Sequence, residues 1–284
     1  MAKIPDNADI LPPSDDRIFK VLLTHPNAKR VLMSVVSTVI ERPVIDVKIL
    51  NTELPVSDIE EKAQRLDINC IIDGGDQINV EMQCSYTEEP AGERDKHIGF
   101  LNKCIYYMAA LYSSQKSKGK EYYKLARTFQ ITFCGYEIFP EYPGFVTRVS
   151  LRRDTGEQIS DQLNMIIVEM SKLIGILNKP AETLTDIEMW TAFFRFAQIP
   201  KYRELINKLI NLKEEIAMAS ELLMEISKDD HERALFLSRR KAETDRISNL
   251  LTVEERGRTE GRMEVFELLE KGVSLEDAKK ILGI

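Results

Sequence analysis

Apolar and polar residues alternate in two short runs that flank a Gly-Gly pair, and this pattern predicts a β-hairpin over residues 66–83. In the first run the polar positions include Asp67, and in the second they include Glu81 and Gln83. Successive side chains of a strand point to opposite faces, so each strand has one apolar face and one face of acids and amides. Strand interiors normally avoid carboxylates, so the polar face of this hairpin is a candidate functional surface.

The faces of the two strands match only if the turn has an odd number of residues. A two-residue turn at the glycines would place Asp67 opposite Met82 and would mix polar with apolar positions. A three-residue turn at 73–75 places Asp67 opposite Glu81, and a five-residue turn also preserves the faces. Opposed like charges destabilise a sheet, so this placement predicts a compensating cation such as Mg²⁺, which one or two carboxylates commonly hold. The alternative is a solvent-facing polar sheet with two unrelated acids.

Periodic patterns predict further helices and strands around the hairpin. The predicted helices begin after an N-cap at Ser14 and cover residues 27–41 and 96–115. The predicted strands cover residues 44–50, 129–133, 145–152 and 165–169. A leading helix, three strands, a crossover helix and a further strand imply an α/β fold with a mixed sheet flanked by helices.

Two apolar stripes are expected, one on a single side of a strand and one on a helix, and the helical stripe is expected to face the core. In strand 44–50 the stripe is formed by Ile45, Val47 and Ile49. In helix 96–115 it is formed by residues at the +3, +4 spacing of a helix, namely Ile98, Leu101, Ile105, Met108 and Tyr112.

After Pro180 the pattern becomes almost wholly helical, which divides the chain into residues 1–180, 181–262 and 263–284. Thr185 with Glu188 predicts a capping box. Trp190 and the phenylalanines that follow it are expected to pack against the first domain.

The last segment has the pattern of a helical hairpin, with a helix C-cap at Lys271-Gly272 and a new N-cap at Ser274. Its two apolar stripes are too small to be stable alone, so we expect residues 263–284 to dock on another surface or to mediate oligomerisation or regulation.

Composition narrows the class of protein. The 284 residues are 43% hydrophobic and 30% charged, as in ordinary soluble proteins. No run approaches 18 apolar residues, and no apolar signal core follows Lys3, so we expect a cytoplasmic protein without a membrane segment. The four cysteines lack a zinc spacing, and the three histidines lie far apart, so neither type predicts a metal centre.

The net charge of −7 argues against strong non-specific binding of nucleic acid. A nuclease with this charge needs a local basic patch, for which the alternative is a solvated loop. The candidate patch consists of Lys116, Lys118, Lys120, Lys124, Arg127, Arg148, Arg152 and Arg153.

Four stretches together resemble a known group of nucleases. They are residues 11–20 with the pattern D-x-x-F-K, Arg65-Leu66-Asp67, Val80-Glu81-Met82-Gln83, and residues 105–115. Their order and spacing over residues 10–180 resemble the PD-(D/E)XK nuclease superfamily. More narrowly, they resemble the Rpn group of recombination-promoting nucleases, which are also labelled transposases. Leu66 stands where the superfamily has proline, and Gln83 stands where it usually has lysine, although glutamine is usual in the narrower group.

This resemblance implies a metal-dependent DNA endonuclease that leaves a 3′-hydroxyl and is linked to DNA recombination or to transposon- or phage-related activity. Residues 1–180 would be the nuclease domain, and Mg²⁺ or another divalent cation would be the cofactor. The implied catalytic residues are Asp67, Glu81 and Gln83. The implied metal ligands are Asp67, Glu81 and the Met82 carbonyl, with Asp16 as a further candidate whose alternative role is interaction with the helix dipole. The implied substrate-binding residues are Lys20, Arg94, Tyr107, Tyr112, Gln115 and Lys116.

The resemblance also implies partners. DNA is the expected substrate. A homo-oligomer through the C-terminal helices is expected, because the charge-dense helix ends in a hairpin with no core of its own. A short C-terminal regulatory product is a further candidate partner, since Rpn-type chains are associated with such products that antagonise the nuclease. The alternative function is a catalytically weak interaction or regulatory protein that uses its helical C-terminal region and retains the sheet as a scaffold. Metal titration separates the two functions, since a scaffold needs no metal at Asp67 and Glu81.

Overall fold

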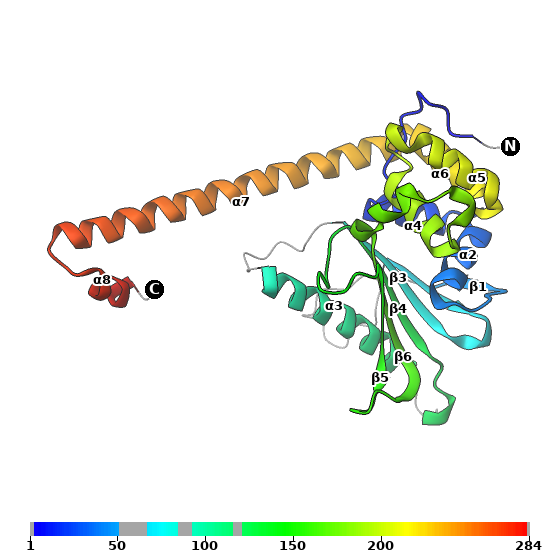
Figure 1. Cartoon of the computed structure of the whole chain (residues 1–284), viewed down its shortest axis with the longest axis horizontal. Coiled ribbons are helices and arrows are strands. Elements are labelled where there is room, and N and C mark those ends of the chain that lie inside the picture. The colour runs from blue at the N-terminus through cyan, green and yellow to red at the C-terminus, as the bar shows by residue number, and fades with distance from the viewer. Residues whose placement is uncertain (1–2, 51–66, 85–92, 116–120, 283–284) are drawn as a thin grey trace. The chain divides into compact units, whose positions relative to one another are not determined.

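The computed structural model describes residues 3–50, 67–84, 93–115 and 121–282 of the chain (Figure 1). The chain forms two compact units, Met1–Asp229 and Asp230–Ile284.

The first unit is built on a mixed sheet, which confirms the predicted α/β class. In the part of the chain that the structure describes, the sheet has six strands in the order β1-β2-β3-β4-β6-β5. β3–β4 and β4–β6 are parallel pairs, and the other neighbours are antiparallel. The strands are β1 Val47–Ile49, β2 Ile68–Ile72, β3 Gln77–Gln83, β4 Thr128–Cys134, β5 Val146–Arg152 and β6 Gln158–Glu169.

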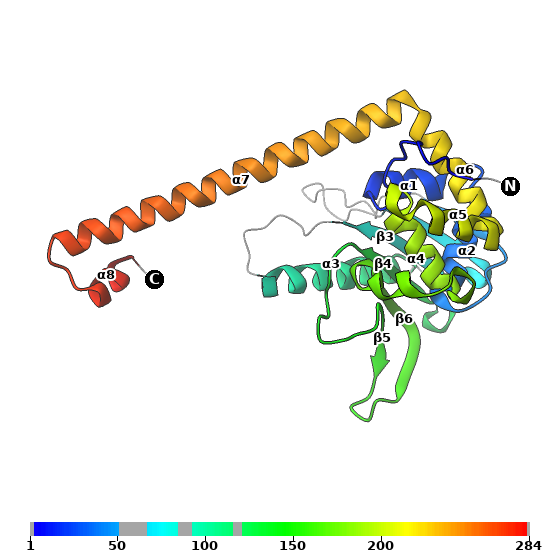
Figure 2. The ribbon, with the colours of Figure 1, turned by 45° about the horizontal axis from the view of Figure 1, so that its top comes forward.

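Helices cover both faces of the sheet. α3 lies over one face and contacts β3, β4 and β6, while α1 packs on β2 and β3 from the other side together with α2 and α4 (Figures 1 and 2). The helices of this unit are α1 Asp16–Thr24, α2 Lys29–Ile40, α3 Glu93–Ser114, α4 Asp186–Phe196, α5 Arg203–Leu212 and α6 Glu214–Lys228.

Two predictions near the N-terminus are wrong in detail. The N-cap of α1 is Asp15, not Ser14, because the Asp15 carboxylate accepts hydrogen bonds from the backbone N–H groups of the first turn. β1 is a short edge strand in which Val47 is buried, whereas Ile45 is 78% exposed and Ile49 is 40% exposed. The strand is shorter than the predicted 44–50, and as an edge strand with a single neighbour it has less of the sheet to pack against.

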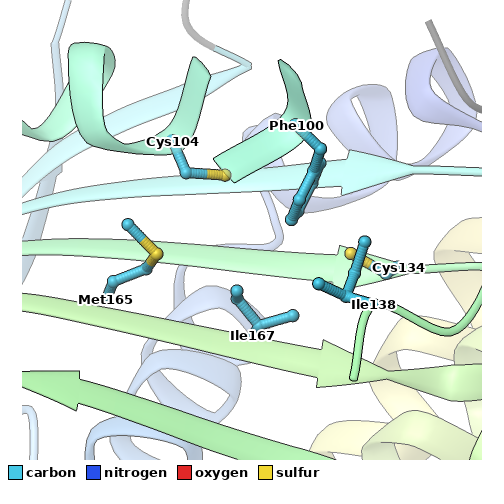
Figure 3. Packing of buried hydrophobic residues seen from close by; sticks show 6 residues of the cluster. All are labelled: Phe100, Cys104, Cys134, Ile138, Met165 and Ile167. Atoms are coloured by element: carbon cyan, nitrogen blue, oxygen red, sulfur yellow. The ribbon is translucent and has the colours of Figure 1, made fainter. Parts of the chain in front are cut away.

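The predicted core stripe of α3 is right in part. Leu101 and Met108 pack against a core cluster, whereas Ile98 and Ile105 are about half exposed. The stripe missed the buried residues Phe100, Cys104 and Leu111. Figure 3 shows Phe100 and Cys104 directed toward the β4 and β6 side chains with which they form an apolar cluster. Both sets of residues follow helical spacing, so the sequence alone could not select the buried face of a helix that is apolar over much of its surface.

α4, the first α-helix after residue 180, belongs to the core of this unit. The Phe194 ring lies 5.1 Å from the Phe19 ring and 5.3 Å from the Phe133 ring, and the Trp190 indole N–H donates to Ser34 Oγ at 3.2 Å. The expected packing of this aromatic group is therefore found, and the expected boundary at 180 lies inside a compact unit that continues to Asp229. The predicted capping box of α4 is present.

The second unit consists of α7 Asp230–Glu270 and α8 Leu275–Leu282. Gly272 has a φ of 81° in the turn between them, and Ser274 Oγ accepts a hydrogen bond from the Asp277 N–H at 3.2 Å, which confirms both predicted caps. Among the described helices, none has the length and apolar character required to cross a membrane.

Candidate active site

The turn between β2 and β3 has an odd number of residues, as predicted, and the number is three. Ile72 N–H donates to the Asp76 carbonyl at 3.0 Å, and Asp73–Gly75 form the turn, in which Gly74 has a φ of 82° and Gly75 a φ of 89°. The register pairs Ile68 with Val80, so its continuation by one residue places Asp67 opposite Glu81. The two acids therefore share one face of the sheet, as the alternation predicted.

The polar face of the hairpin is buried beneath α3 and is not the solvent-facing surface that was the alternative. Glu81 is 2% exposed, and Asn79 and Gln130 are fully buried. The Asn79 amide donates to Glu81 Oε1 at 3.0 Å and to Gln130 Oε1 at 2.8 Å, and the Gln130 amide donates to Thr132 Oγ1 at 3.1 Å. Buried polar groups are normally paired, and here the hydrogen-bonded chain of amides fixes the orientation of the Glu81 carboxylate.

Asp67 is a perturbed acid at the start of β2. Burial, the neighbouring Glu81 carboxylate and, more weakly, Asp16 raise the pKa of Asp67 to about 7, against the lowering effects of the Met82 N–H and of Lys103. The Met82 N–H donates to Asp67 Oδ2 at 3.3 Å. The repulsion between the two carboxylates is the electrostatic condition that a bound cation would relieve.

The backbone of Met82 faces the β2 side of β3. The Gln83 carbonyl accepts from the Gly135 N–H at 2.9 Å, which directs its backbone groups toward β4. Backbone groups of neighbouring residues in a strand point to opposite sides, so those of Met82 point to the β2 side, where its N–H meets Asp67. The role of the Met82 carbonyl as a metal ligand stays a prediction.

Asp16 lies close enough to affect the pKa of Asp67, and its Oδ1 accepts a hydrogen bond from the Arg17 N–H at 2.8 Å. Within the described ranges, no three or more His, Cys, Asp or Glu side chains converge as a metal-binding group. The local hydrogen bond supports the helix-terminus role of Asp16, and its role as a metal ligand stays a prediction.

Lys103 is a site residue that the sequence analysis missed. Its Nζ lies 3.0 Å from Gln83 Oε1 and 3.4 Å from Glu81 Oε2. Burial alone would lower the pKa of Lys103, but Glu81, Tyr107 and Asp67 outweigh it and raise that pKa above its ordinary value, so the side chain is an ammonium. The sequence holds one signal for Lys103. It directly precedes Cys104, which belongs to the buried stripe of α3, so the Lys103 side chain lies at the edge of that stripe.

The predicted substrate-binding residues do not all lie beside the two acids. Tyr107 is half-buried beside the acids, with Lys103 Nζ 5.5 Å from its ring centre, and burial raises the pKa of its phenol. Lys20 lies one turn after Asp16 in α1, and Tyr112 is half-buried farther along α3. The Arg94 side chain and Lys116 lie outside the described residues.

Gln115 is not brought to the site. It follows Lys103 by twelve residues, or about 18 Å of helix. Its amide donates to the Ala126 carbonyl at 3.0 Å and to Thr128 Oγ1 at 3.1 Å, and its oxygen accepts from the Ala126 N–H at 2.8 Å. The buried Gln115 side chain therefore joins the end of α3 to the start of β4.

The described members of the basic patch contact other parts of the chain. Lys124 pairs with Glu121, Arg127 with the buried Asp76, and Arg148 with Glu41. Arg152 and Arg153 contact residues of their own β5–β6 hairpin, while Lys116, Lys118 and Lys120 lie outside the described residues.

Comparison with known protein families gives one match that includes the hairpin. A family model described as "PD-(D/E)XK nuclease family transposase" matches residues 13–252. That range covers the sheet, α1 to α6 and the first half of α7. No curated protein and no solved structure matches the chain significantly.

Proposed function

Because the chain belongs to the PD-(D/E)XK nuclease family transposases, we propose that it is a metal-dependent DNA endonuclease with Asp67 and Glu81 at its reaction centre. The observation that carries the proposal is the pairing of these two acids on one face of the hairpin, where burial and the Glu81 carboxylate raise the pKa of Asp67 to about 7. A sheet tolerates opposed carboxylates poorly unless a cation joins them.

The residues present fit a divalent cation, which nucleases of this family generally use. Asp67, Glu81 and the Met82 carbonyl would hold it, and all three offer hard oxygen donors of the kind that Mg²⁺ prefers. Asn79 Oδ1, two residues before Glu81, is a buried acceptor that makes no hydrogen bond among the described residues. A cation with bound water would supply donors to such an oxygen.

The chemistry follows from the kinds of side chain. The bound cation would polarise the scissile phosphate and lower the pKa of its water. Gln83 does not titrate, so it cannot act as a general base, and its role is to orient the attacking water or to bond a phosphate oxygen. In the reaction, the water oxygen forms a bond to phosphorus as the P–O3′ bond breaks. One water proton ends on O3′, which gives a 3′-hydroxyl and a 5′-phosphate.

Cleavage of supercoiled plasmid with and without Mg²⁺ tests this function, with Glu81→Gln beside the wild type. The amide introduced by this substitution keeps an oxygen that can accept from Asn79, so the variant removes the charge and keeps the shape. We expect Mg²⁺-dependent nicking by the wild type and none by Glu81→Gln or Asp67→Asn. Gln83→Ala should lose less, because one hydrogen bond contributes roughly 1–3 kcal/mol.

Glu221→Gln is the matched control, because Glu221 is an exposed acid on α6 far along the chain from the hairpin. It should cut as fast as the wild type. Equal cutting by Glu81→Gln and the wild type would refute the assignment, and so would cutting that is indifferent to Mg²⁺.

A second candidate function is an interaction or regulatory protein that acts through the C-terminal unit. The observation that favours it is the exposure of Met263, Phe266 and Ile281, each more than 60% exposed. A protein of this kind would bind no divalent cation at Asp67 and Glu81, so the same Mg²⁺ dependence separates the two functions.

A further inference from the structure

We propose that Lys103, on α3, supplies the positively charged hydrogen-bond donor that acts on the scissile phosphate, in a place where the hairpin itself offers only the neutral Gln83. This inference rests on the proposed nuclease function.

The first support is the position of the Lys103 ammonium. Its Nζ is 3.0 Å from Gln83 Oε1 and 3.4 Å from Glu81 Oε2, so it lies over the end of β3 between a proposed metal ligand and the residue proposed to orient water. The Lys103 side chain is 31% exposed, whereas the Glu81 side chain is 3% exposed. The Lys103 side chain is therefore far more accessible than the Glu81 carboxylate to a phosphate that approaches from solvent.

A purely structural role explains the contacts less well. A lysine that only neutralised Glu81 would make its shorter contact to that carboxylate, because an ion pair is the stronger interaction. Lys103 instead makes its shorter contact to the neutral amide of Gln83, and Glu81 already accepts from Asn79 at 3.0 Å. The ammonium is thus shared between a carboxylate and a neutral amide, and the amide contact is the one that an incoming anion could replace.

The donor count supports an incoming anion. An ammonium has three N–H donors and no acceptor. Gln83 Oε1 and Glu81 Oε2 account for two of them, and the Tyr107 ring, 5.5 Å from Nζ, lies beside the ammonium on the next turn of α3. A non-bridging phosphate oxygen would take the third N–H.

The reaction needs a charge at this position. As water adds to phosphorus and the P–O3′ bond breaks, negative charge builds on the non-bridging oxygens. A positioned donor in a site with little water stabilises that charge, and the loss of one such donor typically costs 10²- to 10³-fold in rate. The neutral amide of Gln83 offers no net charge for this purpose.

The test compares Lys103→Met and Lys103→Arg with the wild type in the full chain, by plasmid nicking in Mg²⁺ and by equilibrium binding of Mn²⁺ alone. We expect Lys103→Met to nick about 100-fold more slowly and to bind Mn²⁺ at least as tightly as the wild type, because a neighbouring positive charge is gone. Lys103→Arg keeps the charge and should recover at least about 10-fold of the loss. Lys208→Met, which removes an exposed lysine paired with Glu204, should behave as the wild type.

The outcomes are separable from those of the proposed function. If the wild type nicks, Glu81→Gln does not, and Lys103→Met nicks within about 3-fold of the wild type, the role of Lys103 is refuted while the nuclease stands. Loss of both nicking and Mn²⁺ binding in Lys103→Met would make the residue structural and would also refute it. Equal nicking by Lys103→Arg and Lys103→Met would refute the proposal that the positive charge of Lys103 acts on the phosphate. A wild type that does not nick would refute both this proposal and the proposed nuclease function.

Discussion

Among single residues, Asp67 links the stability of the protein to pH. Burial and the Glu81 carboxylate raise its pKa from 3.8 to about 7 in the folded protein, whereas the unfolded chain keeps the ordinary value. Between these two pH values the folded state holds a proton that the unfolded state has lost. The resulting stability is complete below about pH 4 and is lost as the pH rises toward 7, because the charged carboxylate is disfavoured in its buried position.

We therefore predict that Asp67→Asn raises the free energy of unfolding of the metal-free protein. The asparagine resembles the protonated acid, so the gain over the wild type should be small near pH 4 and about 2–4 kcal/mol above pH 7. Urea unfolding in EDTA at several pH values measures this difference. Asp161→Asn, at a carboxylate that is 61% exposed, is the control and should show no such trend. A difference between Asp67→Asn and wild type that does not change with pH would contradict the prediction.

The sequence could predict that the two acids lie together, but it could not predict that the Lys103 ammonium lies beside them. Asp67 and Glu81 follow from alternation and turn length, which are local features that a period of two makes unambiguous. Lys103 comes from a helix far along the chain, and its place depends on which side of α3 is buried. The resemblance assigned Gln115 to the site, but this residue lies about 18 Å along α3 from Lys103 and joins α3 to the start of β4.

At the scale of elements, Asp76 fixes the hairpin against its neighbours. This carboxylate follows the turn and is 5% exposed. It accepts from Arg42 Nη2 at 2.5 Å, from Arg127 Nε at 3.0 Å and from the Arg127 N–H at 3.2 Å, which ties the hairpin to the end of α2 and to the start of β4. Asp76 thus holds the turn end of the hairpin, which is the end opposite to the two acids.

We predict that Asp76→Ala lowers the free energy of unfolding by about 2–3 kcal/mol, because it leaves two partly buried arginines without their shared acceptor. Asp161→Ala is the matched control, since Asp161 pairs with the same Arg127 at 3.4 Å but is largely exposed. It should change stability by no more than about 0.5 kcal/mol. Chemical denaturation measures both, and equal losses in the two variants would show that the burial of Asp76 adds nothing.

The ends of a strand could be predicted where its burial leaves an alternating hydrophobic pattern in the sequence. They could not be predicted where the strand is polar. β3 and β4 are buried strands near the middle of the sheet, and their alternation gave their limits closely. β6 begins at Gln158, seven residues before the predicted strand, because its polar first half pairs with β5 in a hairpin that extends beyond the sheet core (Figure 2). Backbone pairing there does not depend on an apolar face, so no hydrophobic signal marks it.

At the scale of the whole molecule, the C-terminal unit is a helical hairpin with apolar residues on its surface. Val273 N–H donates to the Leu268 carbonyl at 3.1 Å and Gly272 N–H to the Leu269 carbonyl at 3.0 Å, which closes the end of α7. Phe266 is 64% exposed and Ile281 is 63% exposed. Large apolar residues gathered on a small helical unit favour burial against another surface.

We predict that this unit joins two copies of the chain. Fully burying a side chain such as Phe266 or Ile281 contributes roughly 1.5–3 kcal/mol, so a few such residues from each copy can offset the entropy of association. Sedimentation should give a dimer for the full chain and a monomer for residues 1–229, and a separate 230–284 segment should bind the full chain. Phe266→Asp should weaken the dimer, whereas Leu212→Asp, at an apolar residue of the first unit that is 45% exposed, should not. The same subunit number for the full chain and the 1–229 fragment, with no binding by the separate segment, would contradict the prediction, because the apolar surface of α7 and α8 would then have no partner in solution.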